Sequence, residues 1–238
     1  METINIALGG IPLALALRSP VHLPEFAPFA TDRAPLARVR VPEETLAARL
    51  ARTPENPPDY EEMMALCPLT SDALIPYGRM LIHGAALLWR GRAWLLTGPS
   101  GTGKTTQYVL WKEQFPREVG ILNGDKPVLE LRAGEPWLHA SPWSGKEGMS
   151  RQGCAPLGGI VLLEQGAENR MTPLSPGRVA GQLFMQLLFS RSTPAQVRQA
   201  CALLEGALDR VPLWRLVNRG DPASARLCHD TLEKEALG

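Results

Sequence analysis

The sequence predicts an α/β fold with a mixed sheet at its core, a small strand-rich lobe at the N-terminus and helices toward the C-terminus. Short apolar runs bounded by Gly, Pro and polar residues recur up to about residue 165, a pattern typical of strands. The glycine-rich segment Gly98 to Thr105 separates an apolar run from a stretch without Pro or Gly, which indicates a strand, a loop and a helix in succession. Helical spacing of apolar residues appears later, at Val197, Cys201, Leu204 and Leu208.

Residues 1–75 are expected to form the N-terminal lobe. Several prolines interrupt its apolar runs, which predicts short strands joined by turns. A covering helix is expected over 42–52. The polar, proline-rich segment 53–59 is predicted to be a surface loop and is the best candidate for a boundary with the core. The expected strands lie at 4–8, 11–17 and 39–41.

Residues 76–238 are expected to form the core. Three strands follow one another directly before the glycine-rich loop, two of them joined by a tight turn at Arg90-Gly91-Arg92, and a helix is expected after the loop, from about residue 103. Strands are predicted at 80–83, 85–89, 93–97, 119–125, 128–131, 136–140, 159–165 and 213–217, and further helices at 178–189, 194–208 and from Asp221-Pro222 onward.

Length, charge and cysteine content indicate which classes of protein this chain could belong to. A chain of 238 residues can bury a substantial core, and 25 Lys plus Arg against 24 Asp plus Glu give no reason from bulk charge to expect a nucleic-acid or membrane-surface partner. The sequence has neither a signal-like N-terminus nor an apolar run of about 18 residues, so we expect a soluble, cytoplasmic protein, with oligomer formation left open. The scattered cysteines lack metal-ligand spacing and are expected to be reduced and mostly buried: Cys67, Cys154, Cys201 and Cys228.

The glycine-rich segment Gly98-Pro99-Ser100-Gly101-Thr102-Gly103-Lys104-Thr105 matches the phosphate-binding pattern G-x-x-x-x-G-K-[ST] at every fixed position. Its glycines allow successive backbone N–H groups to point at phosphate oxygens, and a following helix would direct its positive end at them. The motif predicts binding of ATP with Mg²⁺, in which Lys104 contacts phosphate and Thr105 the metal. The residues expected to bind nucleotide are Gly98, Pro99, Ser100, Gly101, Thr102, Gly103, Lys104, Thr105 and Thr106.

Phosphoryl transfer also needs a carboxylate that holds Mg²⁺ or accepts the proton of the acceptor. Two candidates follow apolar strands. Asp125 ends the run Ile121 to Gly124, and Glu164 ends the run Ile160 to Leu163, where it could orient a hydrolytic water. Either could instead be a solvated acid at a strand end.

The stretch from Ile82 to Asp125 resembles the catalytic core of HPr kinase/phosphorylase and its relatives, a core shared with phosphoenolpyruvate carboxykinase. The features that carry the resemblance are His83-Gly84 fifteen residues before Gly98, the phosphate loop itself and the strand ending at Asp125. The chain looks most like the small stand-alone HPr-kinase-like proteins. The resemblance implies a mixed-sheet P-loop core in which His83 orients the catalytic aspartate and Asp125 corresponds to the metal-binding aspartate.

The chain departs from this family at one position. Two consecutive aspartates end the family's strand, whereas this chain has Gly124-Asp125. Either Asp125 combines metal binding with proton acceptance, or the general base is absent.

In the small stand-alone class, the segment Ser141 to Gly148 looks like a further site loop. Lys146 could contact the transferring phosphate or an acidic acceptor, or it could be a solvated lysine in an ordinary hairpin turn. Trp143 is expected to pack in the core, although it could stack on a base.

These features together predict a kinase that moves the γ-phosphoryl group of ATP to a hydroxyl, on a serine of a peptide or protein or on a small molecule. Lys104, Asp125, His83 and Lys146 are the expected catalytic residues, with Mg²⁺ held by Thr105 and Asp125. Two alternatives remain open: a nucleotide-binding sensor without transfer activity, and an ATPase that uses Glu164.

Overall fold

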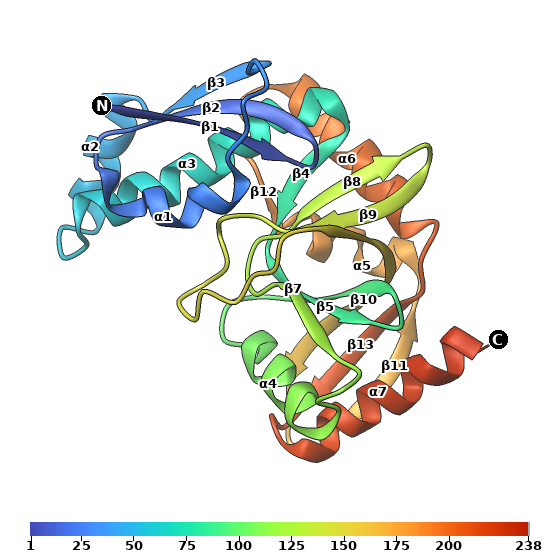
Figure 1. The fold of residues 1–238 in the computed structure, drawn as a ribbon. Coiled ribbons are helices and arrows are strands. Elements are labelled where there is room, and N and C mark those ends of the chain that lie inside the picture. Colours follow the sequence, from blue (N-terminus) through green and yellow to red (C-terminus); the bar gives the residue numbers. More distant parts are fainter. Residues whose placement is uncertain (238) are drawn as a thin grey trace.

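The computed structural model describes residues 1–237 as two sheets flanked by helices (Figure 1). The N-terminal sheet has three strands and the larger sheet has ten, so the fold is a mixed α/β arrangement. Within residues 1–237, no helix combines the length and apolar character needed to cross a membrane.

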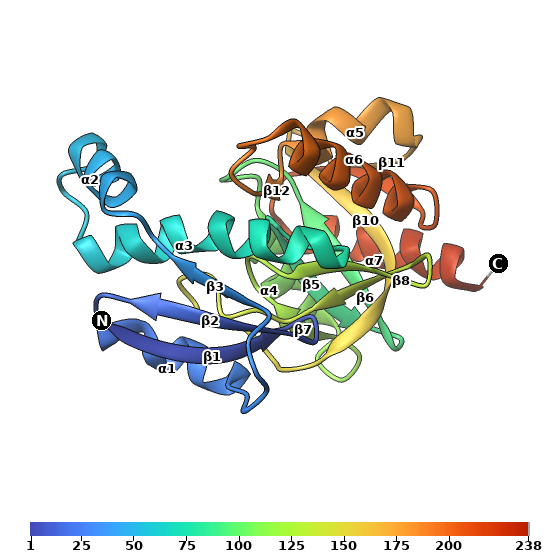
Figure 2. The same cartoon turned by 90° about the horizontal axis from the view of Figure 1, so that it is seen from above.

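The N-terminal sheet has the order β1-β2-β3, with β1 and β2 antiparallel and β2 and β3 parallel. Gly9 and Gly10 join β1 to β2 at φ values of 54° and 80°, as a two-residue hairpin turn requires. Helices α1 and α3 cover the same face of this sheet (Figures 1 and 2). The elements are β1 (Glu2–Leu8), β2 (Ile11–Leu17), η1 (Pro20–His22), α1 (Leu23–Phe26), η2 (Ala27–Phe29), β3 (Ala37–Arg40), α2 (Glu43–Arg52) and α3 (Pro58–Leu74).

The larger sheet has the order β12-β4-β8-β9-β10-β6-β5-β7, and β13 pairs with both β10 and β11. Its strands are β4 (Arg79–Ile82), β5 (Gly84–Trp89), β6 (Arg92–Thr97), β7 (Gly120–Asn123), β8 (Val128–Arg132), β9 (Glu135–His139), β10 (Cys154–Gln165), β11 (Arg170–Leu174), β12 (Leu187–Leu188) and β13 (Leu213–Asn218). The associated helices are η3 (Ile75–Tyr77), α4 (Lys104–Gln114), α5 (Pro176–Phe184), α6 (Pro194–Leu208) and α7 (Pro222–Leu237).

Helices cover both faces of the central strands. Successive residues of β10 alternate between two cores: Ile160 and Leu162 pack with residues of α5 and α6, whereas Val161 and Leu163 pack with residues of α4 and α7. A strand buried on both faces reads as a continuous apolar run, which explains the run that ends at Glu164.

The N-terminal elements share a core with the larger sheet. The cluster beneath β1, β2 and β3 includes Leu81 of β4, Val128 of β8 and Trp143 of the loop that follows β9. The division of the chain near residue 75 therefore stays a prediction.

Several element predictions were wrong. The expected helix over 178–189 ends at Phe184, and Leu187–Leu188 instead forms β12 against β4. The sequence predicted a loop at 53–59 and no helix after it, but Pro58–Leu74 forms helix α3. Pro58 stands in the first turn of this helix, where the missing N–H of proline costs nothing. Residues 20–29 form short helical turns rather than turns between strands. The strand expected at 159–165 begins earlier, at Cys154, and β11 was not anticipated.

Candidate active site

The glycine-rich loop connects the end of β6 to the start of α4, as the sequence predicts. Gly98, Gly101 and Gly103 have φ values of 141°, 83° and 94°, a region that other residues rarely adopt. A Cβ on Gly98 would lie 2.8 Å from the carbonyl oxygen of Leu163, so the neighbouring strand β10 also requires glycine here. The path of the loop thus depends on its glycines.

Lys104 folds back over the loop. Its Nζ donates to the carbonyl oxygens of Gly98 and Pro99 at 3.0 Å each, and the residue is 9% exposed. Burial lowers the pKa of Lys104, and the negative charge of Asp125 opposes that shift. Thr97, directly before the loop, donates from Oγ1 to the carbonyl oxygen of His83 at 2.7 Å, so the loop begins beside His83.

Two side-chain amides that the sequence did not indicate donate hydrogen bonds to carbonyl oxygens of the glycine-rich loop. Gln165, at the end of β10, donates from Nε2 to the carbonyl oxygen of Gly101 at 2.8 Å. Asn218, at the end of β13, donates from Nδ2 to the carbonyl oxygens of Thr102 at 3.3 Å and Glu164 at 2.9 Å. Each amide ends an apolar strand parallel to its neighbour, and such strand ends meet at one edge of a sheet, which is the signal that could have found them.

Asp125 lies beside His83, as the resemblance implies. The strand predicted over 119–125 ends earlier, at Asn123, so Asp125 lies two residues beyond β7. The carbonyl oxygen of Asp125 accepts from Gly84 N at 2.8 Å. Oδ1 of Asp125 is 3.4 Å from Nε2 of His83, and Oδ2 contacts the ammonium of Lys126.

The other ring nitrogen of His83, Nδ1, lies 3.2 Å from Oε1 of Gln186, a residue that the sequence reasoning did not single out. Burial lowers the pKa of His83, Lys104 lowers it further, and Asp125 opposes both effects. His83 therefore lies between an amide and a carboxylate and favours the neutral imidazole.

The side chain of Asn123 shapes the turn that carries Asp125. It is fully buried, and its Oδ1 accepts from the backbone N of Asp125 at 3.0 Å and of Lys126 at 2.7 Å. Its Nδ2 donates to the carbonyl oxygen of Ser141 at 2.9 Å. One amide thus ties the strand end to the beginning of the 141–150 loop.

The packing around Gly124 leaves no room for a side chain. A Cβ there would lie 2.8 Å from the carbonyl oxygen of Ser144 and 3.1 Å from that of Met149. Its backbone N donates to the carbonyl oxygen of Met149 at 2.8 Å. The 141–150 loop therefore occupies the space in which a first aspartate would sit.

Lys146 is exposed at the tip of the 141–150 loop. Within the described part of the chain, the cation paired with Asp125 is Lys126, and no ion pair joins Lys146 to it. The structure thus brings Lys104, His83 and Asp125 together but leaves Lys146 outside this group.

Trp143 belongs to the core and does not offer a surface for a base. It is 3% exposed, meets Phe26 edge to face at 5.6 Å and donates from Nε1 to the carbonyl oxygen of Met63 at 3.2 Å. The expectation that the cysteines are mostly buried holds for Cys67 and Cys228, but Cys154 is exposed and Cys201 is partly exposed.

Thr105 is half-buried in the first turn of α4, and Thr106 is exposed. Hydroxyl and carboxylate oxygens such as those of Thr105 and Asp125 are hard donors of the kind that Mg²⁺ prefers, so the donor set fits this ion. Glu164 is the penultimate residue of β10 and pairs through Oε1 with Nε of Arg215 at 3.1 Å.

Cavities open on both sides of the loop. One, of about 400 Å³, is lined by Pro99, Glu164 and Gln186 among others. The other, of about 460 Å³, is lined by Gly103, Thr106 and Arg219 among others. The loop is therefore accessible from two directions.

No protein-family model and no curated protein sequence matches this chain. Among solved structures, it is similar to the Hpr(Ser) kinase/phosphatase from Coxiella burnetii, with a TM-score of 0.41 and 10% sequence identity. The similarity covers 66% of this chain and 90% of the other. At this TM-score it supports no conclusion about activity.

Proposed function

We propose that this protein transfers the γ-phosphoryl group of Mg·ATP to a hydroxyl group of a peptide, a protein or a small molecule, on a core of the HPr kinase/phosphoenolpyruvate carboxykinase type. One observation carries the proposal: the strand that leads into the glycine-rich loop is bonded beside the His83–Asp125 pair. Oγ1 of Thr97 donates to the carbonyl oxygen of His83 at 2.7 Å, and Nε2 of His83 lies 3.4 Å from Oδ1 of Asp125. A phosphate-binding loop beside a carboxylate is the minimum that phosphoryl transfer requires.

The loop and Lys104 would bind the phosphates. Nζ of Lys104 can exchange its bonds to the carbonyl oxygens of Gly98 and Pro99 for bonds to phosphate oxygens. The N-terminus of α4 adds its positive dipole end, and Thr105 with Asp125 would hold Mg²⁺, which when bound neutralises charge on the phosphates. Most of the catalytic effect would then come from positioning and charge neutralisation.

Asp125 is also the group best placed to accept the proton of the attacking hydroxyl. The hydroxyl oxygen forms the new bond to the γ-phosphorus, the bond to the β,γ-bridging oxygen breaks, and ADP leaves. Because the 141–150 loop fills the space beside Gly124, no carboxylate can stand there, and Asp125 would combine both tasks. His83, flanked by Gln186, would fix the orientation of the Asp125 carboxylate.

The test is Lys104→Ala, with transfer followed by mass spectrometry on candidate acceptors. We expect transfer to fall at least about 100-fold with unchanged far-UV circular dichroism, because Lys104 acts mainly on charge that develops in the transition state. Lys234→Ala, a change of an exposed lysine on α7, is the matched control and should transfer normally. Full activity of Lys104→Ala would contradict the proposal.

Two further variants separate this function from the alternatives. Asp125→Asn should bind nucleotide and lose transfer, whereas Glu164→Gln should transfer normally, because Glu164 is paired with Arg215. If phosphate is released in the absence of any acceptor, and if this release is lost in Glu164→Gln, the ATPase is favoured. Tight Mg·ATP binding with no product over hours would favour the sensor, for which the absent carboxylate at Gly124 is the supporting observation.

A further inference from the structure

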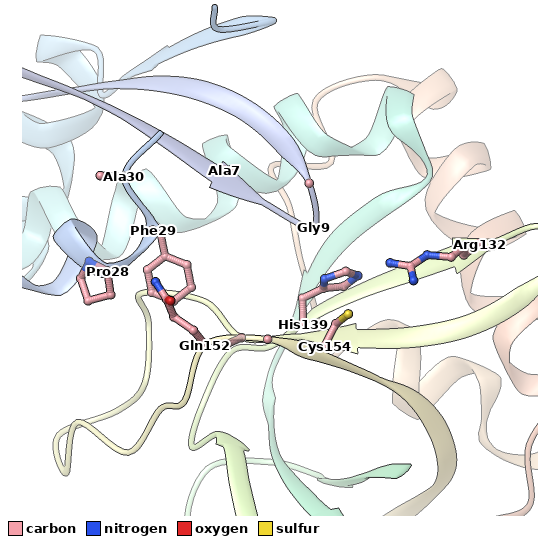
Figure 3. Close-up of a pocket in the computed structure, with 12 residues that line it drawn as sticks. Ala7, Gly9, Pro28, Phe29, Ala30, Arg132, His139, Gln152 and Cys154 are labelled. Atoms are coloured by element: carbon pink, nitrogen blue, oxygen red, sulfur yellow. The ribbon is translucent and has the colours of Figure 1, made fainter. Parts of the chain in front are cut away.

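One cavity lies away from the glycine-rich loop. It has a volume of about 540 Å³ and is bounded by the β1–β2 turn, by η2 and by the sheet face where β8, β9 and the start of β10 meet. Figure 3 shows His139 and Cys154 on adjacent strands, with the guanidinium of Arg132 directed back toward them and Gln152 beside Phe29. His139 and Cys154 are register partners in the β9–β10 pair.

The charges on this sheet face do not balance. Glu130 is 2% exposed, and its carboxylate lies 2.5 Å from Arg79, 2.9 Å from Arg132 and 2.5 Å from Nε2 of His139. Burial lowers the pKa of His139, although Glu130 opposes that shift, so the imidazole favours its neutral form near pH 7. Two guanidinium groups thus face Glu130, and Glu135, the register partner of Arg132, is paired with Arg210 at 3.8 Å, which leaves one positive charge.

That charge is on Arg132, whose guanidinium also stacks over the ring of Trp137, with Cζ 4.2 Å from the ring centroid. Arg79 is occupied, since its Nε donates to the carbonyl oxygen of Gly9 at 2.6 Å and its Nη1 contacts the carbonyl oxygen of Tyr77. The side chain of Arg132 is 45% exposed and lines the cavity, with the Cys154 thiol beside it. The wall of the cavity therefore presents a cation.

A second cavity adjoins the first on the side of the 141–150 loop. It has a volume of about 300 Å³ and shares Pro28, Phe29 and Gln152 with the first. Its far end is lined by Ser144 and Gly148 of the 141–150 loop. A Cβ on Gly145 of that loop would lie 3.3 Å from Cβ of Asp125, so the groove ends next to the candidate active site.

The length of the groove follows from the strand register. Val128 stands opposite His139 in the β8–β9 pair, and it lies three residues after Asp125. Three residues span at most roughly 10 Å, and Arg132 lies four residues further along β8. A ligand that reaches from Asp125 to Arg132 must therefore be elongated.

We propose that this groove is the acceptor site, and that the acceptor is an elongated molecule whose end remote from the reacting hydroxyl carries a carboxylate bound by Arg132. A single unmatched positive charge suits a carboxylate better than a phosphate group, which carries about −1.5 to −2. This inference rests on the proposed phosphotransferase function.

The anion site is tested by the reactivity of Cys154 in a Cys201→Ser background, in which Cys154 is the one thiol of the chain that is not buried. Rates are measured with a reagent that carries carboxylates (5,5′-dithiobis(2-nitrobenzoic acid)) and with a neutral one (4,4′-dithiodipyridine). The ratio of the two rates cancels the intrinsic reactivity of the thiol. We expect the anionic reagent to be favoured about fivefold, and the preference to disappear in Arg132→Gln and in high salt.

Arg38→Gln, a change of an exposed arginine on β3, is the matched control and should leave the ratio unchanged. A ratio that is the same with and without Arg132 overturns the anion site. Because this measurement uses no nucleotide, its result is independent of the proposed function.

The acceptor path is tested by tethering. Hydroxyl-terminated thiols of increasing length are attached to Cys154 as mixed disulfides, and Mg·ATP is added. A tether that reaches Asp125, roughly 10–15 Å away across two strand spacings, should gain one phosphoryl group by mass. Shorter tethers should not, and neither should the same tethers on Cys201 in a Cys154→Ser variant. The tether hydroxyl loses its proton to Asp125, its oxygen bonds to the γ-phosphorus, and ADP leaves.

Two negative outcomes are distinguishable. No phosphorylation at any tether length, in a protein that transfers the phosphoryl group from Mg·ATP to water in a Lys104-dependent manner, overturns the groove as the acceptor site. No Lys104-dependent turnover at all overturns the proposed function instead.

Discussion

At the scale of single residues, Gly124 shows how packing restricts the chemistry of the site. Carbonyl oxygens of Ser144 and Met149 approach within the distance at which a Cβ would clash. The replacement of the first of the two family aspartates by Gly124 is therefore not a change of one side chain alone. The 141–150 loop lies in the space that the aspartate side chain would need.

We predict that Gly124→Asp does not raise the rate of transfer. The new side chain must displace the 141–150 loop, so the variant should lose at least about 1–3 kcal/mol of stability, as overpacked sites usually do. Transfer assays and urea unfolding check both expectations. Gly134→Asp, a change at a hairpin glycine with open space around its Cα but a φ of 84°, is a control for backbone strain without the clash. A faster Gly124→Asp enzyme would contradict this account.

Stability should fall on acidification through His139. Its pKa is lowered in the folded protein, chiefly by burial, so the unfolded chain binds the proton more tightly. The contribution of His139 is present above the ordinary histidine pKa of about 6.5 and is lost as the pH falls below it. Urea unfolding at pH 7.5 and 5.5 should show a smaller difference for His139→Gln than for the parent protein. An equal effect of the partly exposed His22→Gln would argue against a specific role of burial.

At the scale of elements, local signals decide which parts of the fold the sequence predicts. Helix α6 matches its predicted bounds because Thr193 and Gln196 form a capping box and Pro194 occupies the first turn. The strand before the glycine-rich loop and the helix after it follow from equally local patterns.

We predict that Thr193→Ala lowers the free energy of unfolding by about 1 kcal/mol, because the backbone N of Gln196 loses its acceptor. Thr193→Ser keeps the hydroxyl and should be close to neutral. Denaturant titrations of both variants provide the measurement, and equal losses would mean that the cap does not contribute.

Elements defined by long-range contacts could not be predicted in this way. Strand β12 has two residues and exists because Leu187 and Leu188 pair with β4. The sequence predicts a loop at 53–59 and no helix after it, whereas α3 begins at Pro58 and continues through Pro68, so contacts with the rest of the core decide this element. In the site, the motif indicates Lys104 and the resemblance indicates Asp125, but the supporting amides Asn123, Gln165, Gln186 and Asn218 become apparent only when the strands are assembled.

At the scale of the whole molecule, the N-terminal sheet and the larger sheet share one core. Trp143 lies in the loop that follows β9 of the larger sheet, and its indole packs with Phe26 and Met63 in the core of the N-terminal sheet. The larger sheet shares its core with the N-terminal sheet at β4 and β8, so the two should depend on each other for stability.

We predict a single unfolding transition for the whole chain, with coincident changes in far-UV circular dichroism and tryptophan fluorescence. Trp143→Ala should lower the stability of the entire transition by about 3–5 kcal/mol, because it empties a fully enclosed site. Trp143→Phe should lose less. Two separate transitions, of which Trp143→Ala shifts one alone, would show that the two parts fold independently.

The burial of Trp143 has a consequence for motion. The loop that carries this indole also borders Asp125, so the loop cannot lift away on its own without exposing the indole to water. Widening of the groove must instead carry the N-terminal sheet along with the loop. The part of the chain with no chemistry of its own would then set how fast a long acceptor enters and its phosphorylated form departs.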